Sequence, residues 1–320
     1  MTYLSSAISF SRKLPALALG ISTFMLSACA ALQQGADSQN PMVVYISGSG
    51  GQKDVYISDI QGKNPRALTQ DVAEDAHPRL TLDGRVVFAS KRTGTWQVYI
   101  MNRDGSDVRA LTTERGVNNY RPFPSPDGRV VFVSDRYLKP QIFSINADGS
   151  DLRRLSEGDF HNDYPVVADD GHIYYTTSRG SKWDIWKMAP DGTRQRQVTR
   201  VPMNVQEIAV VPPMYKDYAE RFTNRSPMIP FYSFETENRL VFSALTDTGT
   251  LGIFRVDEDG SNLQNLSQPG MYISRSPVLM PNGQVLFTSD RNGSTDVWTM
   301  YPDGKIPRQV VKEAAYESTS

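Results

Sequence analysis

The chain has 320 residues, of which 39% are hydrophobic, so it is long enough to bury a sizeable core. Its 34 basic and 35 acidic residues nearly balance, which argues against nucleic acid or an anionic membrane surface as an electrostatic partner. The single cysteine excludes an internal disulfide, so packing must hold the fold together.

The first 28 residues are typical of an export signal. Arg12 and Lys13 precede an apolar stretch that runs from Leu14 to Leu26, and small residues follow it. This stretch is too short to cross a hydrocarbon core of roughly 30 Å as a helix, but it suits a cleaved signal peptide. We therefore interpret residues 1–28 as a signal peptide.

Cys29 directly follows Leu26-Ser27-Ala28, and it is the only cysteine in the chain. This pattern resembles the lipobox of bacterial lipoproteins, in which the cysteine receives palmitate and other acyl groups and becomes the mature N-terminus. The alternative is an ordinary signal peptide cleaved nearby. Ala30 resembles the residue that directs such proteins to the outer membrane, and the polar residues 29–40 would then be a lipidated tether.

A hairpin signal recurs through the rest of the chain. Its glycines are 43, 44, 43, 68 and 44 residues apart, at Gly62, Gly105, Gly149, Gly192, Gly260 and Gly304. An earlier turn precedes this glycine by 21 or 22 residues in five copies, at Asp83-Gly84, Asp127-Gly128, Asp170-Gly171, Glu237-Asn238 and Asn282-Gly283. Such turns between apolar runs mark β-hairpins.

The apolar runs between these turns predict four short strands in each copy. The second strand is represented by Val86-Val87-Phe88 and the third by Val98-Tyr99, and similar runs recur in six copies. Strands that are apolar on both faces need neighbours on both sides, and six sheets stacked radially supply them. We therefore predict an all-β, six-bladed β-propeller of four-stranded antiparallel blades over residues 41–320. Blade one lacks an obvious first strand, so it has either three strands or a weak fourth from Gly35 to Gln39.

The segments SPDGRVVFVSDR, NGQVLFTSDRNGSTDVW and NADGSDLRRLS resemble the WD-type repeats of the TolB family, periplasmic six-bladed propellers of the Tol-Pal envelope system. The resemblance covers Pro41 to about Lys312. It implies a protein-binding role, since the TolB propeller docks the peptidoglycan-associated lipoprotein, Pal, over its central opening. Only about ten residues separate Cys29 from the first strand, so the resemblance is to a lipoprotein form without the N-terminal domain of TolB.

The long glycine spacing indicates an insertion at about residues 202–230. We expect it to join the last strand of blade four to the first strand of blade five, on the face that holds His77 and His161. Its aromatic residues Tyr215, Tyr218 and Phe222 suit a contact surface, although a loop folded onto its own blade explains them equally well.

Polar and aromatic residues precede the innermost strands on the same face. With the insertion they form the predicted binding face, whose residues are His77, Tyr120, Arg121, His161, Asp163, Tyr164, Tyr215, Tyr218, Phe222 and Arg275. Such a mixture suits recognition of a protein loop, peptide or glycan, and it also suits a hydrated channel.

Signals for catalysis and cofactors are weak. His172 follows a hairpin on the face opposite His77 and His161, so the three histidines cannot share a metal ion; a two-histidine site with Glu74 or Asp163 is the alternative. No nucleophile motif or phosphate-binding loop is present. We predict no cofactor and no catalytic residue.

An arginine recurs on the loop between the second and third strands of four blades, at Arg92, Arg136, Arg179 and Arg291. These arginines are interpreted as structural devices in preference to an anion-binding ring.

Three functional hypotheses remain. The first is a non-enzymatic scaffolding lipoprotein at the periplasmic side of the outer membrane, which binds an envelope protein partner, Pal-like or other. The second is a propeller that binds or processes cell-wall glycans or peptides. The third is a structural element of a larger envelope assembly.

Overall fold

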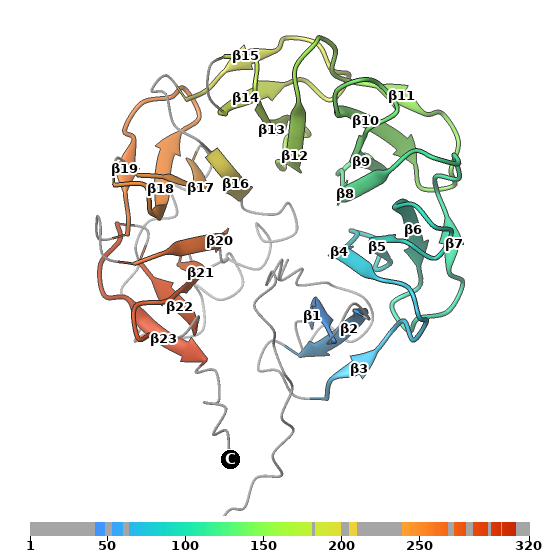
Figure 1. Ribbon diagram of the computed structural model, residues 1–320, viewed down its shortest axis with the longest axis horizontal. Coiled ribbons are helices and arrows are strands. Elements are labelled where there is room, and N and C mark those ends of the chain that lie inside the picture. The colour runs from blue at the N-terminus through green and yellow to red at the C-terminus, as the bar shows by residue number, and fades with distance from the viewer. Residues whose placement is uncertain are drawn as a thin grey trace, which may run out of the picture.

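The computed structural model describes residues 42–48, 53–59, 64–180, 183–199, 205–209, 239–246, 248–267, 272–279, 284–293, 296–301 and 303–311. Within these ranges the chain forms β-strands that build six antiparallel sheets, arranged as blades around a ring (Figure 1). No helix among the described residues is long and apolar enough to cross a membrane.

The strands follow one another along the chain from the centre of the ring outward. Blade one contains β1 (Met42–Ser47), β2 (Asp54–Asp59) and β3 (Arg66–Ala67). Blade two contains β4 (Asp75–Leu80), β5 (Val86–Ser90), β6 (Gln97–Met101) and β7 (Arg109–Ala110). Blade three contains β8 (Asn119–Pro124), β9 (Arg129–Ser134), β10 (Gln141–Asn146) and β11 (Arg153–Arg154).

The second half of the ring repeats this order. Blade four contains β12 (Asn162–Val167), β13 (Ile173–Thr177), β14 (Asp184–Met188) and β15 (Arg196–Gln197). Blade five contains β16 (Val205–Ala209), β17 (Arg239–Leu245), β18 (Leu251–Asp257) and β19 (Gln264–Asn265). Blade six contains β20 (Ser274–Leu279), β21 (Val285–Ser289), β22 (Asp296–Met300) and β23 (Arg308–Val311).

The predicted six-bladed propeller is confirmed, with four strands in five of the blades. Blade one has three described strands, and β1 pairs with β2 as the second strand pairs with the third elsewhere. Gly35 to Gln39, the alternative source of a fourth strand, lie outside the described residues.

The predicted second and third strands are buried because each blade packs against its neighbours. Phe88 stacks on Tyr99 with ring centroids 5.7 Å apart, and Phe132 stacks on Phe143 at 6.0 Å. These cross-strand aromatic pairs hold β5 to β6 and β9 to β10 in register. The radial stacking explains why strands without a polar face fold stably in this chain.

A buried hydroxyl ties the outer strand to the third strand in five blades. The hydroxyl oxygens accept the backbone N–H of the third strand at 2.8–3.1 Å, in the pairs Thr69 with Val55, Thr112 with Val98, Ser156 with Ile142, Thr199 with Ile185, and Ser267 with Ile253. Outer strands of two residues cannot form a full ladder, so this bond satisfies a donor that would otherwise be buried without a partner.

The recurring hairpin glycines also join one blade to the next. Gly192 has a φ of +85°, and a Cβ atom there would lie 2.5 Å from the carbonyl oxygen of Leu155 in the preceding blade. Gly105 and Gly304 make the same close approach to Leu68 and Leu266. Glycine is therefore required by space as well as by backbone conformation.

The position predicted for the insertion is wrong. β16 lies inside the predicted insertion and is the innermost strand of blade five, so the long segment 210–238 joins the first strand of that blade to the second. The other innermost strands each contain an X-Pro pair, at Pro78, Pro122, Pro165 and Pro277, and β16 has none. Without this marker the strand could not be distinguished from the segment that follows it.

This correction changes the face on which the segment begins and ends. We define the Arg121 face as the side where the innermost strands begin and the hairpin face as the opposite side, which carries Asp83-Gly84 and Asp104-Gly105. Ala209 ends β16 and Arg239 begins β17, and both positions are at the hairpin face. The segment 210–238 therefore begins and ends at the hairpin face, whereas it was expected on the Arg121 face.

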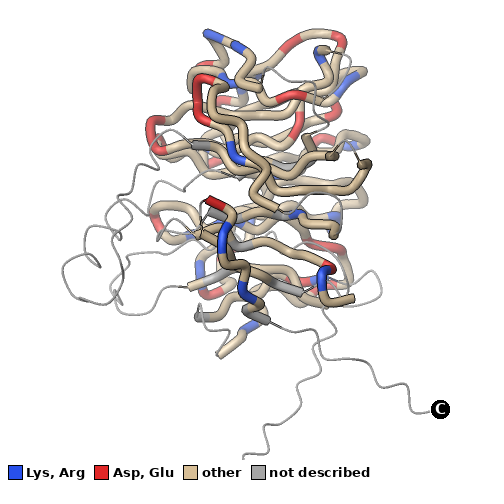
Figure 2. Tube along the Cα trace, turned by 90° about the vertical axis from the view of Figure 1, so that its left-hand side faces the viewer, with Lys and Arg blue, Asp and Glu red and all other residues tan. Residues whose placement is uncertain are grey.

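Acidic and basic positions are interspersed along the described ring when it is seen from the side (Figure 2).

Candidate functional site

Three neighbouring innermost strands share an unusual backbone conformation on the wall of the ring. His77, Arg121 and Tyr164 occupy one register position in β4, β8 and β12, each before a proline, with φ of 52°, 52° and 48°. Each lies at a break in the pairing with the second strand. A non-glycine residue in this region costs on the order of 1 kcal/mol or more, so the surrounding structure must hold it there.

A second set of left-handed residues gives a useful contrast. It follows the outer hairpin in all six blades, at Asn64, Asp107, Asp151, Arg194, Asn262 and Ile306. A conformation repeated in every blade belongs to the architecture. The wall conformation is seen in blades two, three and four, and the break in pairing that accompanies it recurs in blade six between Arg275 and Val278.

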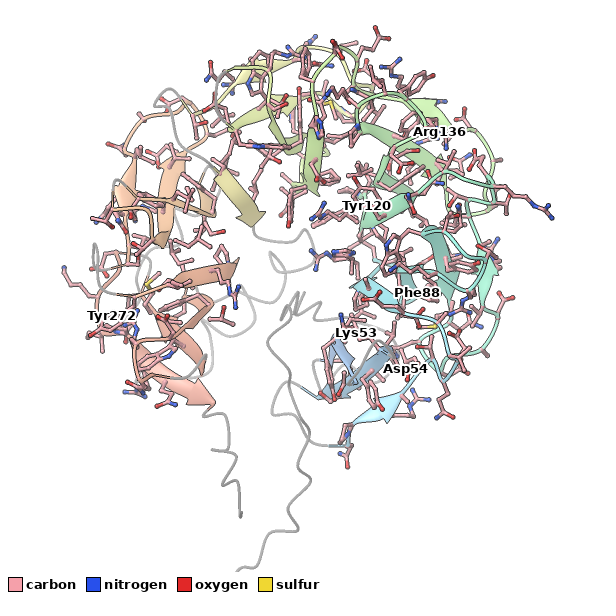
Figure 3. The ribbon with its side chains drawn as sticks, viewed as in Figure 1. Lys53, Asp54, Phe88, Tyr120, Arg136 and Tyr272 are labelled. Carbon is pink, nitrogen blue, oxygen red and sulfur yellow. The ribbon has the colours of Figure 1, made fainter. Side chains whose placement is uncertain are left out.

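Arg121 is the centre of this wall. Its Nη1 lies 2.7 Å from both carboxylate oxygens of Asp163 in the next blade. Its guanidinium carbon lies 3.7 Å from the ring centroid of Tyr164 and 5.4 Å from that of Tyr120. The guanidinium thus lies over two aromatic rings. Figure 3 shows Tyr120 nearer the centre of the ring than Arg136 of the same blade.

The electrostatics of the wall follow from partial burial. Burial disfavours the charged guanidinium, but Asp163 and the two tyrosines outweigh it and raise the pKa of Arg121. Burial and the Asp163 carboxylate raise the pKa of Tyr120, so its hydroxyl stays protonated. The side chains of Arg121 and Asp163 remain 20% and 17% exposed, so the pair is partly open to solvent.

His77 has no compensating partner. Both of its ring nitrogens are buried and have no hydrogen-bond partner among the described residues, although part of the residue is exposed. Burial, together with the charges of Arg121 and Arg79, lowers the pKa of His77 to about 3. The imidazole is therefore neutral at physiological pH, which makes it a weak general base.

Sequence analysis missed Arg79. It pairs with Val87 in the register where Phe123 pairs with Val131 and Val166 pairs with Tyr174, and Phe123 and Val166 are buried. Its guanidinium carbon lies 5.3 Å from the ring centroid of Phe123. The signal available in the sequence was an arginine at a repeat position that is otherwise apolar. The preceding pair, His77-Pro78, indicated only His77 as a candidate.

The four repeated arginines have the structural role that was favoured for them. Each guanidinium lies over aromatic rings near its loop: Arg92 over Tyr99 at 4.6 Å, Arg136 over Phe143 at 4.5 Å, Arg179 over Trp186 at 4.1 Å, and Arg291 over Trp298 at 4.7 Å. Arg136 also donates from Nε to the Ser134 hydroxyl at 3.0 Å. These contacts fix each loop against its own blade.

The histidines are separated as expected. His161 directly precedes β12 and packs edge-on against Trp183 at 5.9 Å, while His172 binds Asp170 at 2.7 Å on the hairpin face. Glu74, the other candidate ligand, accepts from Lys53 and Lys91 at 2.9 Å each. Among the residues that the structure describes, no three potential metal ligands gather.

Arg275 shares the register of Tyr120 and Asp163 but belongs to blade six, away from the cluster on blades two to four. Its carbonyl accepts the hydroxyl of Thr288 at 3.1 Å. The remaining predicted residues, Tyr215, Tyr218, Phe222 and Cys29, lie outside the described part of the chain.

Comparison with solved structures supports the fold. TolB from Acinetobacter baumannii superposes with a TM-score of 0.64 at 15% identity, covering 84% of this chain and 64% of that one. A putative TolB from Agrobacterium tumefaciens has a TM-score of 0.52 at 18% identity and covers 69% of this chain and 76% of that one. A puromycin-hydrolysing peptidase from Mycobacterium tuberculosis has a TM-score of 0.61 at 15% identity, covering 88% and 44%.

At these identities the structural likeness shows the fold alone, and the chain spans about two thirds of the length of the A. baumannii protein. No curated protein sequence matches the chain. The family model described as the TolB beta propeller domain matches residues 35–209, more than half of the chain. The protein therefore belongs to the TolB beta-propeller domain family.

Proposed function

We propose that this protein is a non-enzymatic binding module of the cell envelope, which holds an envelope protein partner against the Arg121 face. The observation that supports this proposal is the wall of blades two to four, where strained backbone, an inter-blade ion pair and two tyrosines coincide. Residues held in strained backbone conformations cluster at ligand-binding sites, and here they coincide with the ion pair and the aromatic contacts.

The surface suits a protein partner. Tyrosine and arginine are the residues that most often carry binding energy at protein interfaces, and here they are held rigidly by their mutual stacking. Exposed apolar side chains also lie on loops of the Arg121 face: Val72 is 92% exposed and Leu138 is 89% exposed. A Pal-like protein is one candidate partner, by analogy with the family.

The proposed location is the periplasmic side of the outer membrane, with Cys29 as the lipidated anchor and residues 29–40 as the tether. The tether would keep the ring near the membrane and so raise the local concentration of membrane-bound partners. Replacement of Cys29 by serine should move the protein from the membrane fraction to the soluble periplasmic fraction and abolish labelling by a palmitate analogue. Retention in the membrane would contradict lipid anchoring.

Partner binding is tested by affinity capture from detergent-solubilised envelopes. The Tyr120→Ala variant should recover at least tenfold less partner than wild type, because the contact between the Tyr120 ring and the Arg121 guanidinium is lost. Leu152→Ala, on the hairpin face and 39% exposed, is the matched control and should recover the wild-type amount. Equal recovery by both variants would remove the Arg121 face from the proposal.

The non-enzymatic assignment has its own test. Purified protein is incubated with cell-wall glycan and peptide fragments, and we expect no new products. Products that disappear in a His77→Gln variant would show instead that the wall is catalytic.

A further inference from the structure

Arg79 departs from the repeat at a position that the architecture makes apolar. Phe123 and Val166, which hold the same register in blades three and four, are only 6% and 5% exposed. Arg79 is only partly buried, but burial of its Nε and Nη1 still costs desolvation and side-chain entropy that a leucine or valine would avoid. Its contact with Phe123 does not need a charge, so packing alone does not explain the residue.

Unpaired polar atoms lie on the same strand, β4, and on the neighbouring innermost strand, β8. Nε and Nη1 of Arg79 and Nε of Arg121 are donors that are buried without a partner among the described residues. Both ring nitrogens of the neutral His77, one a donor and the other an acceptor, are also buried and unpaired among these residues. His77 and Arg121 lie at the same break in pairing on the neighbouring strands β4 and β8, and the guanidinium carbon of Arg79 lies 5.3 Å from the ring centroid of Phe123 on β8. The charges of both arginines act on His77. Buried donors are nearly always paired in folded proteins, so this group requires an acceptor.

The charge of the cluster indicates what the acceptor is. The cluster contains two guanidinium groups, those of Arg79 and Arg121, and one described carboxylate, Asp163. This carboxylate binds Nη1 of Arg121. A second carboxylate would neutralise Arg79 and would accept hydrogen bonds from the donors left over. Guanidinium groups can donate two parallel hydrogen bonds to the two oxygens of a carboxylate, and the Asp163 contact uses only Nη1 of Arg121.

We propose that Arg79, Arg121 and His77 form a subsite for one carboxylate of a peptide partner, either an acidic side chain or a chain terminus. The inference rests on the proposed function, since it assigns a recognition group to the partner that binds the Arg121 face. Asp163 is then a positioning residue, which orients Arg121 and leaves its Nε for the ligand.

The test uses the whole mature protein and defined small probes. N-acetylglutamate α-amide carries only the side-chain carboxylate, and N-acetylglutamine carries only the terminal one. Calorimetric titration should show saturable millimolar binding of at least one probe, which also raises Tm by about 2–4 °C near saturation. Inorganic phosphate and chloride at equal ionic strength should bind at least tenfold more weakly.

Arg79→Leu separates binding from stability. It should weaken carboxylate binding at least about tenfold, because a charged hydrogen bond is lost, while its Tm without probe should equal or exceed that of wild type. Arg109→Leu is the matched control. Arg109 lies on the outer strand β7 and donates to the carbonyl of Ala147 at 2.9 Å, so replacing this arginine should leave probe affinity unchanged.

Three results would overturn the subsite. One is the absence of saturable carboxylate binding; another is a preference for phosphate; the third is a large loss of Tm in Arg79→Leu, which would make the residue structural. Each of these could occur while envelope capture still succeeds, in which case the proposed function stands without the subsite. Probe binding without envelope capture would reject the protein partner and keep the subsite.

Discussion

Arg121 in blade three and Asp163 in blade four are joined by one guanidinium nitrogen that lies 2.7 Å from both carboxylate oxygens. The pair links two innermost strands at the wall of the ring, where Tyr164 covers the guanidinium. The ion pair therefore contributes both to closure between blades and to the shape of the proposed site.

Removal of the negative charge should destabilise the protein. Asp163→Asn leaves the half-buried guanidinium without its counter-charge, and we expect the free energy of unfolding to fall by about 2–3 kcal/mol in denaturant titrations. Asp303→Asn is the control, since its pair with Lys305 is largely exposed and should be worth less than about 1 kcal/mol. Equal effects of the two substitutions would mean that the wall pair has no special role.

The lowered pKa of His77 should make the stability of the folded protein sensitive to acid. Its pKa is about 3 in the folded protein and 6.5 in the unfolded chain, so the unfolded state binds the proton more tightly. The contribution of this residue to stability is complete above pH 6.5 and falls with pH between 6.5 and 3, by about 1.4 kcal/mol per pH unit.

Denaturant titrations of wild type and His77→Gln at pH 7 and pH 4.5 measure this contribution. Wild type should lose about 2.5 kcal/mol more stability than the variant over that range, because glutamine does not titrate. A wild type and variant that lose the same amount would show that His77 does not carry the acid sensitivity.

The hairpin glycines should differ according to what they approach. Gly192→Ala places a methyl group against the carbonyl of Leu155, whereas a Cβ at Gly128, with nearly the same φ, meets nothing within 4 Å. Both variants pay the backbone cost, so Gly192→Ala should be less stable than Gly128→Ala by at least about 1 kcal/mol. Thermal unfolding of the two variants makes the comparison, and identical Tm values would refute the close packing between blades.

The hydroxyl that ties the outer strand to the third strand should be worth one buried hydrogen bond. Thr112→Val keeps the shape of the side chain but leaves the N–H of Val98 without its 2.9 Å partner. We expect a loss of about 1–3 kcal/mol in the free energy of unfolding. The exposed neighbour Thr113 supplies the control, Thr113→Val, which should change stability by less than about 0.5 kcal/mol.

Most of the fold was predictable because it is periodic. The outer hairpin glycine and the β-branched runs repeat six times, so a local error in one copy is corrected by the others, and this repetition predicted the number of blades and the order of the strands. Blade five failed because β16 lacks the X-Pro pair that marks the other innermost strands, and periodicity could not replace that marker beside a long insertion.

The position of the Arg121 cluster could be predicted, but not its full composition, and its role as a binding face stays a prediction. Residues before the innermost strands were expected at the channel, and Tyr120, Arg121, Asp163 and Tyr164 do gather there. Arg79 was missed because its significance depends on a side-chain register between blades, which a single sequence does not display. Repetition correctly assigned Arg92 and Arg136 to structure, since their aromatic partners repeat with them.

The most direct test of the account is site-specific photo-crosslinking in intact cells. A benzophenone amino acid is placed at Tyr120 on the wall, and at Leu152 on the hairpin face as control. We predict one dominant crosslinked protein from position 120 and none from position 152. Equal products at the two positions, or a product only at position 152, would contradict binding through the Arg121 face.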